Sequence, residues 1–554
     1  MLKIQQVNQT LIKQWENLNS LNTLIFTLNK KDLLHIHEDE KSITLFYGFL
    51  DQDYKDNAAS FVSDILNSIG VNGLNDCYGS FIVIHFDYVS KTFILANDAL
   101  GDFSLHYCKK DDGIIYLAEL PESLLTRTNC EVSSDRLIHY FALAKPQNKA
   151  GFFKQIKQLG AGQYLTVDKD INIFQYYKPL EIVNYKSIST SELSEQFKSL
   201  MQTAIDYQTR GQKRIGVMMS GGMDSTFVAA NALKTGKPVS TFSYIFPNMP
   251  ETNETLWIDA MRGLELDMHT FVGESSYWPL KPPWYVSLNS PHSNQYRHLK
   301  DVIYQQAKHK DIKILLSGLY ADHLYTGYIY WLVDQIKRKP FKAIASMYAT
   351  MSKYGIKQGL RQIAPAKWSS HAKSKNRFLN KKTSQRFEEL QQQQTKYQHP
   401  HPQQFALVYG TSTAQSVWLD HEHAYRHDIY VRHPFRDRRV VEFLMSLPAW
   451  VLGNFEIKKG LVRQASKDLL PDSIIRRTKI TTLTPLYIKG VLEKEFHRVK
   501  TLLTDSNCQW QKYVDQKLIM QLINNPSAIK QDAELMVLWQ CISFELWKKR
   551  LNNI

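Results

Sequence analysis

The sequence is poor in cysteine and has no long apolar run. Only five of the 554 residues are cysteines, and no two of them stand in a Cys-x-x-Cys spacing. Scattered cysteines in odd number argue against a disulfide framework and against a cysteine-rich zinc site. No run of about 18 apolar residues occurs, so no transmembrane helix is expected. The first residues also lack the apolar core of a signal peptide. We therefore expect a cytoplasmic protein.

The chain is strongly basic, with a net charge of +15 at pH 7. Nucleic acid is the first partner that such a charge suggests. However, no zinc-finger spacing, RNP-like motif or basic helix accompanies the charge, and much of it falls between Lys367 and Arg386. That segment is more typical of a solvated surface than of a binding patch, so we expect neither nucleic acid nor a membrane as partner. An acidic substrate would account for part of the remaining charge.

The first 185 residues show the pattern of a β-rich domain. Short β-branched or aromatic runs alternate with turn residues, and the Asp-Asp-Gly sequence at 111–113 marks a tight hairpin. The expected strands are 43–48, 80–86, 92–96, 114–118 and 163–168.

After residue 190 the pattern changes to alternating helices and strands. This order predicts a parallel sheet with helices on both faces, and ligands of such sheets bind outside the carboxyl ends of the strands. Beyond about residue 325 helical periodicity dominates. The expected elements are helix 191–209, strand 214–219, helix 225–235, strand 238–246, helix 251–264 and strand 312–318.

The most informative motif is SGGMDS at 220–225, which directly follows the apolar run 215–219. A strand, a glycine-rich turn and a helix form an anion site, because backbone N–H groups and the helix N-terminus face the ligand. The Asp224 carboxylate is suited to Mg²⁺, and the Gly-Lys-Ser/Thr ending of the usual P-loop is absent. The motif resembles the pyrophosphate loop of the ATP pyrophosphatases, which implies that ATP is a substrate. The residues expected to bind phosphate are Ser220, Gly221, Gly222 and Ser225.

Further segments extend this resemblance to one family. Residues 317–323 (SGLYADH) resemble the SGxGxDE turn of asparagine synthetase and its relatives, and residues 432–437 (RHPFRD) resemble the family's R-x-PF-x-D element. Nearer the N-terminus, residues 79–81 and 98–102 resemble the family's amidotransferase part. The resemblance covers most of the chain, with the motifs in the family's order.

The resemblance implies an α/β fold with two domains. Residues 1–185 are expected to form a class II glutamine amidotransferase-like domain, which is an Ntn-hydrolase-like β-sandwich of α+β type. Residues 190–554 are expected to form a doubly wound α/β ATP-pyrophosphatase domain with a helical extension.

The N-terminus departs from the family members that use glutamine. Those members carry an N-terminal cysteine, whose own α-amino group serves as base for the thiolate attack. Here the first two residues are Met1 and Leu2, and the first cysteine is Cys77. We therefore expect this domain not to hydrolyse glutamine and to act as a scaffold or in substrate docking. Asparagine synthesis from glutamine is disfavoured.

Relatives without a glutamine supply adenylate a carboxylate and let an amine of the same substrate attack it. β-Lactam synthetase and carbapenam synthetase close small rings in this way, and lasso-peptide cyclases close a macrolactam. The sequence Asp322-His323 resembles the Asp-His that lasso cyclases often carry at this point of the turn, where asparagine synthetases carry Asp-Glu. We expect an ATP- and Mg²⁺-dependent lasso-peptide macrolactam synthetase, acting on a peptide or small-molecule carboxylate, with a leader-binding protein and a protease as partners. The alternatives are an amide synthetase that uses ammonia or an external amine, and a catalytically degenerate binding subunit.

The resemblance also assigns roles to individual residues. Asp224 and Asp322 are the expected Mg²⁺ ligands, and Gly318 is expected beside the pyrophosphate. Lys459 matches the lysine that neutralises negative charge during adenylation and amide formation. Lys458 is the alternative if the register is shifted by one residue.

The base that deprotonates the attacking amine is left open by the sequence. Tyr320 stands in the 317–323 turn where the family has a glycine. His323 has the ordinary pKa of a proton-transfer group, and Glu422 with Tyr425 could act as base and orienter. We carry Tyr320, His323 and Glu422 forward as candidates.

Overall fold

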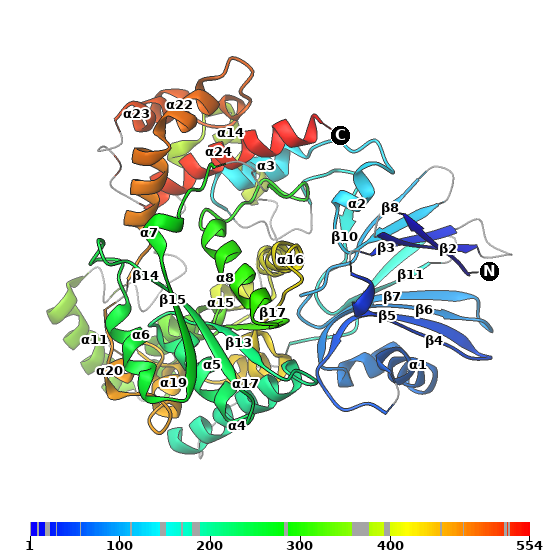
Figure 1. Ribbon diagram of the computed structural model, residues 1–554, viewed down its shortest axis with the longest axis horizontal. Helices are drawn as coiled ribbons and strands as arrows, with labels where there is room; N and C mark the ends of the chain where they lie inside the picture. The colour runs from blue at the N-terminus through cyan, green and yellow to red at the C-terminus, as the bar shows by residue number, and fades with distance from the viewer. Residues whose placement is uncertain are drawn as a thin grey trace.

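The computed structural model describes most of the chain and shows two β-sheets packed on each other beside a third, parallel sheet (Figure 1). The described residues are 2–7, 10–16, 23–28, 30–55, 57–110, 114–144, 151–167, 170–179, 189–281, 286–338, 340–356, 360, 376–392, 399–454, 457–479, 481–525, 529 and 532–553. Among them, no helix combines the length and the apolar character needed to cross a membrane.

The N-terminal part is a sandwich of two six-stranded sheets. Because side chains alternate along a strand, Ile43, Leu45 and Tyr47 of one strand face the core between the sheets, whereas Phe46 packs under the first helix. The first sheet has the order β1 (Leu2–Val7), β2 (Thr10–Glu16), β3 (Thr23–Leu28), β9 (Ile115–Ala118), β8 (His106–Lys109) and β10 (Lys157–Gln158). The second has the order β12 (Ile171–Gln175), β11 (Gln163–Val167), β7 (Thr92–Asn97), β6 (Gly79–Asp87), β5 (Ser42–Leu50) and β4 (Leu34–Glu38). The helices of this part are α1 (Ala58–Ser68), α2 (Glu122–Leu125) and α3 (Ser134–Phe141).

The third sheet is parallel and doubly wound, as the alternation of helices and strands predicts. Its order is β15 (Leu266–Val272), β14 (Val239–Ile245), β13 (Ile215–Met218), β16 (Ile314–Ser317) and β17 (Tyr430–Arg432). One face packs on α4 (Thr190–Gln208), α5 (Met223–Leu233), α17 (Arg438–Ser446) and α19 (Gly460–Ala465). The other face packs on α8 (Arg297–His309) and α16 (Thr411–Tyr425). The strand order turns back between β13 and β16, and ligands of such sheets bind at this point.

A helical extension follows the parallel sheet, and its last helix returns to the N-terminal part (Figure 1). Tyr140 of α3 donates a hydrogen bond to the carbonyl of Gln540, 3.0 Å away, and the Gln540 amide donates back to the carbonyl of Tyr140 at 2.6 Å. The further helices are α6 (Thr255–Ala260), α7 (Gly273–Ser276), α9 (Ala321–Tyr325), α10 (Trp331–Arg338), α11 (Pro340–Tyr354), α14 (Lys381–Gln392), α15 (Pro402–Tyr409), α18 (Ala449–Leu452), α20 (Asp472–Ile475), α21 (Thr484–Tyr487), α22 (Phe496–Thr504), α23 (Gln516–Asn524) and α24 (Asp532–Leu551).

Two buried ion pairs join the sandwich to the parallel sheet. The Arg432 guanidinium lies 2.7 and 2.6 Å from the two carboxylate oxygens of Asp51, and each side chain is only 5% exposed. Arg436 pairs in the same way with Asp102, with its Nε 3.0 Å from Oδ1. Both arginines belong to the RHPFRD segment, so this motif fixes the relative position of the two parts of the chain. We call Arg432–Asp51 and Arg436–Asp102 the joint pairs.

We expect Asp51→Ala to destabilise the protein by about 3–5 kcal/mol, because the Arg432 charge is left buried without its carboxylate. The matched control is Arg210→Ala, which breaks the exposed ion pair with Asp53, 2.7 Å long, and costs about 0–1 kcal/mol. Chemical denaturation of the two variants checks this difference. Equal losses would mean that the joint pairs contribute no more than a surface contact.

The predicted strands of both parts are present, with ends shifted by at most two residues. Helix 251–264 is shorter than predicted, because α6 starts only at Thr255 and residues 261–263 form a 3-10 turn. The sequence missed β15, an edge strand in which half-exposed and exposed side chains alternate instead of forming an apolar run. The predicted hairpin at 111–113 lies outside the described residues, as does the basic segment up to residue 375.

Candidate active site

Two loops meet at the carboxyl ends of the neighbouring strands β13 and β16. The SGGMDS loop follows β13, and the 317–323 turn follows β16. The loops touch at Gly318, where a Cβ atom would lie 2.7 Å from the backbone nitrogen of Ser225. A side chain at this position would push the two loops apart, so Gly318 is required for their packing.

Serine hydroxyls hold the SGGMDS loop in shape. The Ser220 backbone N–H donates to Oγ of Ser225 at 3.0 Å, and the N–H of Gly222 donates to Oγ of Ser220 at 3.1 Å. The Ser225 hydroxyl also contacts the carbonyl of Ser220, 3.0 Å away. The loop therefore adopts one shape at the N-terminus of α5, where the helix dipole favours an anion.

One lysine connects the acidic residues of both loops. Nζ of Lys459 lies 2.5 Å from Oδ2 of Asp224 and 2.8 Å from Oδ1 of Asp322. Burial alone would lower the pKa of Lys459, but the two carboxylates outweigh burial and raise it, so the lysine is charged at neutral pH. The structure thus brings together three residues that lie far apart in the sequence. The alternative Lys458 is exposed and has its ammonium group 5.9 Å from the Tyr328 ring.

The residues around Asp224 fit a bound cation. Its second oxygen, Oδ1, is buried without a hydrogen-bond partner among the described residues. Burial raises the pKa of Asp224 to about 6, although Lys459 opposes the shift. A buried carboxylate oxygen with an unused lone pair is the kind of ligand that Mg²⁺ takes, and Asp322 supplies a second carboxylate whose side chain is 75% exposed.

An arginine beside the loop was not assigned a role from the sequence. Arg477 stacks 3.9 Å above the Trp257 ring and forms an ion pair of 2.5 Å with Glu254. Its Nη1 is buried and has no hydrogen-bond partner within the described part of the chain, and this atom lies 3.2 Å from where a Cβ of Gly221 would be. Arg477 therefore directs an unused donor toward the loop. The order Arg-Thr-Lys at 477–479 was the only signal for it in the sequence.

The backbone of Tyr320 has a conformation that is typical of glycine. Its φ is 70°, a left-handed conformation that costs a residue with a side chain roughly 1–2 kcal/mol. Ring contacts offset this cost, because Tyr320 packs edge-on against His433 at 4.9 Å and against His323 at 5.5 Å. The departure from the glycine pattern thus leaves the backbone of the turn intact and adds an aromatic ring to the site.

Tyr320 is directed at a carboxylate that the sequence did not single out. Its hydroxyl lies 3.5 Å from Oδ2 of Asp420, and Oδ1 of Asp420 is 2.6 Å from Nζ of Lys300. Burial and the Asp420 charge raise the pKa of Tyr320 well above its ordinary value, so the hydroxyl keeps its proton at neutral pH. Tyr320, Asp420 and Lys300 form a chain of proton donors and acceptors, which we call the Tyr320 relay.

Helical periodicity explains why Asp420 and not Glu422 faces the site. The residues of α16 that line the adjoining cavity include Ser416, Leu419, Asp420 and His423, which stand at positions i, i+3, i+4 and i+7 and share one face. Glu422 lies on another face. Its Oε2 accepts hydrogen bonds from Ser287 at 2.7 Å and Asn289 at 3.1 Å.

The structure therefore places Glu422 among hydrogen-bond partners with a structural role and not beside the SGGMDS loop or the 317–323 turn. Burial, followed by the charge of Glu122, raises the pKa of Glu422 well above its usual range. Tyr425, its predicted orienter, is buried in the core between the sandwich sheets. The pair of Glu422 and Tyr425 expected from the sequence is not brought to the cavity.

A cavity of about 730 Å³ opens beside the 317–323 turn. Its walls come from α3 of the N-terminal part, from α8 and α16, and from α24 at the C-terminus. His323 and Asp322 lie in the lining together with the Tyr320 relay, and Arg136 and Arg297 add two buried positive charges. The volume lies in the range of pockets for drug-sized ligands, roughly 300–1,000 Å³.

Comparison with known protein families decides the assignment of this site. The model of the asparagine synthase family matches residues 196–549, which include both loops and Lys459. The chain belongs to the asparagine synthase family. It is therefore an ATP-dependent carbon–nitrogen ligase that forms AMP and pyrophosphate. The model of the glutamine amidotransferase domain matches residues 58–178 of this family member.

Curated relatives of this asparagine synthase family member are distant. Asparagine synthetase [glutamine-hydrolyzing] 1 of Bacillus subtilis (strain 168) is 20% identical over 481 residues, which cover 82% of this chain and 74% of the relative. Asparagine synthetase [glutamine-hydrolyzing] 3 of the same organism is 24% identical over 485 residues, covering 80% and 73%. Among solved structures, the glutamine phosphoribosylpyrophosphate amidotransferase of B. subtilis covers 51% of this chain and 72% of its own, with 10% identity and a TM-score of 0.19, too low to support an argument.

The cysteines in the amidotransferase-like part of this family member are not activated nucleophiles. Burial raises the pKa of Cys77 to about 12 and that of Cys108 to about 11, and burial also raises the pKa of Cys130. A thiol with a raised pKa carries little thiolate at neutral pH. The raised pKa values of the three thiols agree with the expected absence of glutamine hydrolysis, which stays a prediction.

We expect Gly318→Ala to weaken binding of ATP with Mg²⁺ in this asparagine synthase family member at least ten-fold, about 1.4 kcal/mol. The added Cβ would meet three backbone atoms of Asp224 and Ser225 at 2.7–2.9 Å, so the loop must move. The measurement is the rise in melting temperature that ATP and Mg²⁺ produce. Gly263→Ala is the control, because nothing lies within 4 Å of its Cβ position. An equal ATP-induced rise in both variants would show that the loop contact is dispensable.

Proposed function

We propose that this chain closes an amide bond within one peptide substrate, as a macrolactam synthetase of the lasso-peptide cyclase kind. The observation that carries the proposal is the large cavity at the 317–323 turn, which joins the Tyr320 relay to Asp322. A free amino acid would leave most of this space empty, whereas a folded peptide segment fits it. The peptide would supply both the carboxylate and the amine.

The first step is adenylation of the substrate carboxylate. A carboxylate oxygen attacks the α-phosphorus of ATP, the bond to the β-phosphate breaks, and pyrophosphate leaves with the electron pair. The SGGMDS loop and Arg477 hold the pyrophosphate, and Lys459 balances the charge that develops at the α-phosphate. A Mg²⁺ ion, held by Asp224 and Asp322, supplies further charge neutralisation when bound.

The second step joins the amine to the acyl adenylate. The amine nitrogen attacks the carbonyl carbon, the bond to AMP breaks, and one proton must leave the nitrogen. The neutral Tyr320 hydroxyl accepts this proton as it gives its own to Asp420, and the ion pair with Lys300 orients Asp420. His323 lines the same cavity and is the second candidate for this proton.

The walls of the cavity support a peptide substrate. Arg136 and Arg297 are each 6% exposed, and among the described residues neither forms an ion pair with a carboxylate, although the Asp301 charge acts on Arg297 from a longer distance. Burying such charges is costly unless an anion joins them, so the substrate is expected to carry an acidic group besides the adenylated one. A precursor peptide meets this need through its side chains or its C-terminus, and it would be delivered with a leader-binding protein and a protease as partners.

The experiment that tests the proposal measures pyrophosphate release and product mass together. The full chain is incubated with ATP, Mg²⁺ and a candidate precursor peptide encoded beside its gene. We expect peptide-dependent pyrophosphate release, accompanied by the loss of one water from the peptide mass. Release that requires a small amino acid and ammonia would replace the proposal by an amide synthetase with an external amine. No turnover of ATP by the folded chain with any substrate would support a binding subunit instead.

A further inference from the structure

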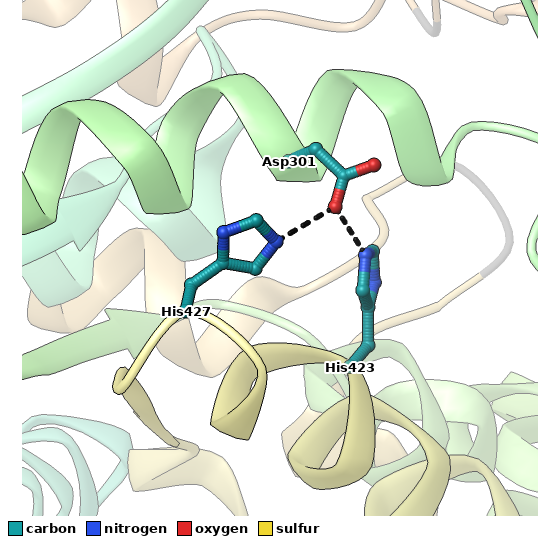
Figure 2. A group of neighbouring side chains, drawn as sticks. All are labelled: Asp301, His423 and His427. Atoms are coloured by element: carbon teal, nitrogen blue, oxygen red, sulfur yellow. Dashed lines mark hydrogen bonds and ion pairs between the residues drawn. The ribbon is translucent and has the colours of Figure 1, made fainter. Parts of the chain in front are cut away.

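Three side chains of the types that ligate metal ions converge outside the SGGMDS loop and the 317–323 turn. Figure 2 shows Asp301 of α8 between the imidazole rings of His423 and His427, which extend from the end of α16 and the turn after it. Oδ1 of Asp301 lies 2.6 Å from Nε2 of His423 and 2.9 Å from Nε2 of His427. The ligand atoms all lie within 4.8 Å of one another. We call these three residues the Asp301 cluster.

The local sequence explains the convergence. His423 and His427 are four residues apart, and the backbone N–H of His427 still bonds to the carbonyl of Ala424 at 2.9 Å. The two rings therefore leave the same side of the chain, one helical turn apart. Tyr304 of α8 packs against both, with ring centres 5.3 Å from His423 and 5.5 Å from His427, and so limits how far the rings can rotate.

The distances from Asp301 to the two histidines suit a metal ion that holds neighbouring ligands at right angles. For an ion about 2.0–2.1 Å from each ligand, atoms at right angles stand about 2.9 Å apart. The two Asp301–histidine separations of 2.6 and 2.9 Å lie close to this value, and the two histidine nitrogens lie within 4.8 Å of each other. Two histidines and one carboxylate form a known type of metal site, which leaves positions open for water or substrate.

The cluster is accessible from solvent and from the large cavity. The side chains of Asp301 and His427 are 28% and 18% exposed. His423 is buried, but it lines the large cavity.

The positive charges nearby set a limit on the affinity. Lys300 is neutralised by its ion pair with Asp420. Arg297 interacts with the charge of Asp301 and opposes an added cation. The affinity should therefore be lower than that of a four-ligand structural zinc site.

We propose that Asp301, His423 and His427 bind a divalent transition-metal ion, such as Zn²⁺ or Co²⁺, at the wall of the large cavity. Two nitrogen ligands and one oxygen ligand favour these ions over Mg²⁺, which prefers oxygen. The ion would tie α8 to α16 close to the Lys300–Asp420 pair. This site is separate from the Asp224 and Asp322 carboxylates, and its existence does not depend on the proposed peptide substrate.

The test is a titration of the untagged, EDTA-treated full chain with Co²⁺. We expect one Co²⁺ per chain, with visible ligand-field absorption that Zn²⁺ abolishes and that Mg²⁺ leaves unchanged. Asp301→Asn keeps an oxygen that can accept both hydrogen bonds but loses the charge. Loss of outer contacts alone costs about 10–100-fold in affinity, so we expect the loss of this ligand to exceed 100-fold.

Two controls keep the outcome clear. His427→Asn removes the more exposed histidine and should also abolish the absorption. His309→Ala, an exposed histidine of the same helix α8, should leave both affinity and stoichiometry unchanged. The proposal is overturned if the wild-type chain shows no Co²⁺ absorption, or if Asp301→Asn binds Co²⁺ as tightly as the wild type. In that case the Asp301 cluster is a hydrogen-bond network.

Discussion

Lys459→Ala should abolish adenylation while the chain stays folded. We expect ATP–pyrophosphate exchange to fall by about 10²–10³-fold, the typical loss when one group that stabilises developing charge is removed. Lys459 is suited to this role because two carboxylates keep it charged and fix its position between the two loops. The measurement is substrate-dependent exchange of labelled pyrophosphate into ATP.

Lys458→Ala is the matched control for this prediction. Lys458 precedes Lys459, is exposed and carries the same charge, so its removal changes the net charge equally without touching either aspartate. Lys459→Arg adds a second comparison, because it keeps the positive charge but changes the shape and position of the group that carries it. If Lys458→Ala lost exchange and Lys459→Ala kept it, the functional lysine would be Lys458.

Asp420→Asn should separate the two chemical steps. We expect pyrophosphate exchange to persist, since Asp420 does not contact the SGGMDS loop, and amide formation to fall by about 10²–10⁴-fold, the range for loss of general base catalysis. The reason is that the Tyr320 hydroxyl can no longer pass its proton to a carboxylate. The measurement compares exchange with product formation for the same substrate.

Glu422→Gln tests whether the loss of amide formation depends on the position of the replaced carboxyl group, and not on the removal of any acidic group from α16. Glu422 lies two residues from Asp420 on the same helix, but it does not line the cavity, and its carboxyl group is hydrogen-bonded to Ser287 and Asn289. We expect near wild-type product formation per folded molecule. Tyr320→Phe should resemble Asp420→Asn, because it removes the hydroxyl and keeps the ring. Loss of product in Glu422→Gln with full activity of Asp420→Asn would restore Glu422 as the candidate base.

Local motifs predicted the SGGMDS loop and the 317–323 turn, whereas the carboxylate that we propose as partner of Tyr320 depended on tertiary packing. The two segments were predictable because glycines, serines and a following helix N-terminus form a loop of known shape. Asp420 has no such motif. It was recognisable only once the neighbours of α16 showed which face of this helix is turned to the cavity, and the sequence offered Glu422 of the same helix as a candidate instead.

The same contrast applies to the fold. Central strands such as β13 and β16 are apolar runs and were predictable, because both of their faces are buried. The edge strand β15 has the mixed pattern of a half-exposed segment. The closure of α24 onto α3 is set by contacts between residues some 400 positions apart, which no local pattern records. The left-handed Tyr320 was also not predictable, since its strain is offset only by rings from elsewhere in the fold.

The joint pairs have a consequence for how this protein can evolve. Asp51 and Asp102 belong to the amidotransferase-like part, yet each neutralises a buried arginine of the synthetase part. A lineage that lost the first part would leave Arg432 and Arg436 buried without their carboxylates, and either arginine could be replaced safely only together with its partner. We therefore expect selection for ligase activity to preserve residues in the amidotransferase-like part whatever chemistry that part performs. We expect the two parts to be inherited as one unit.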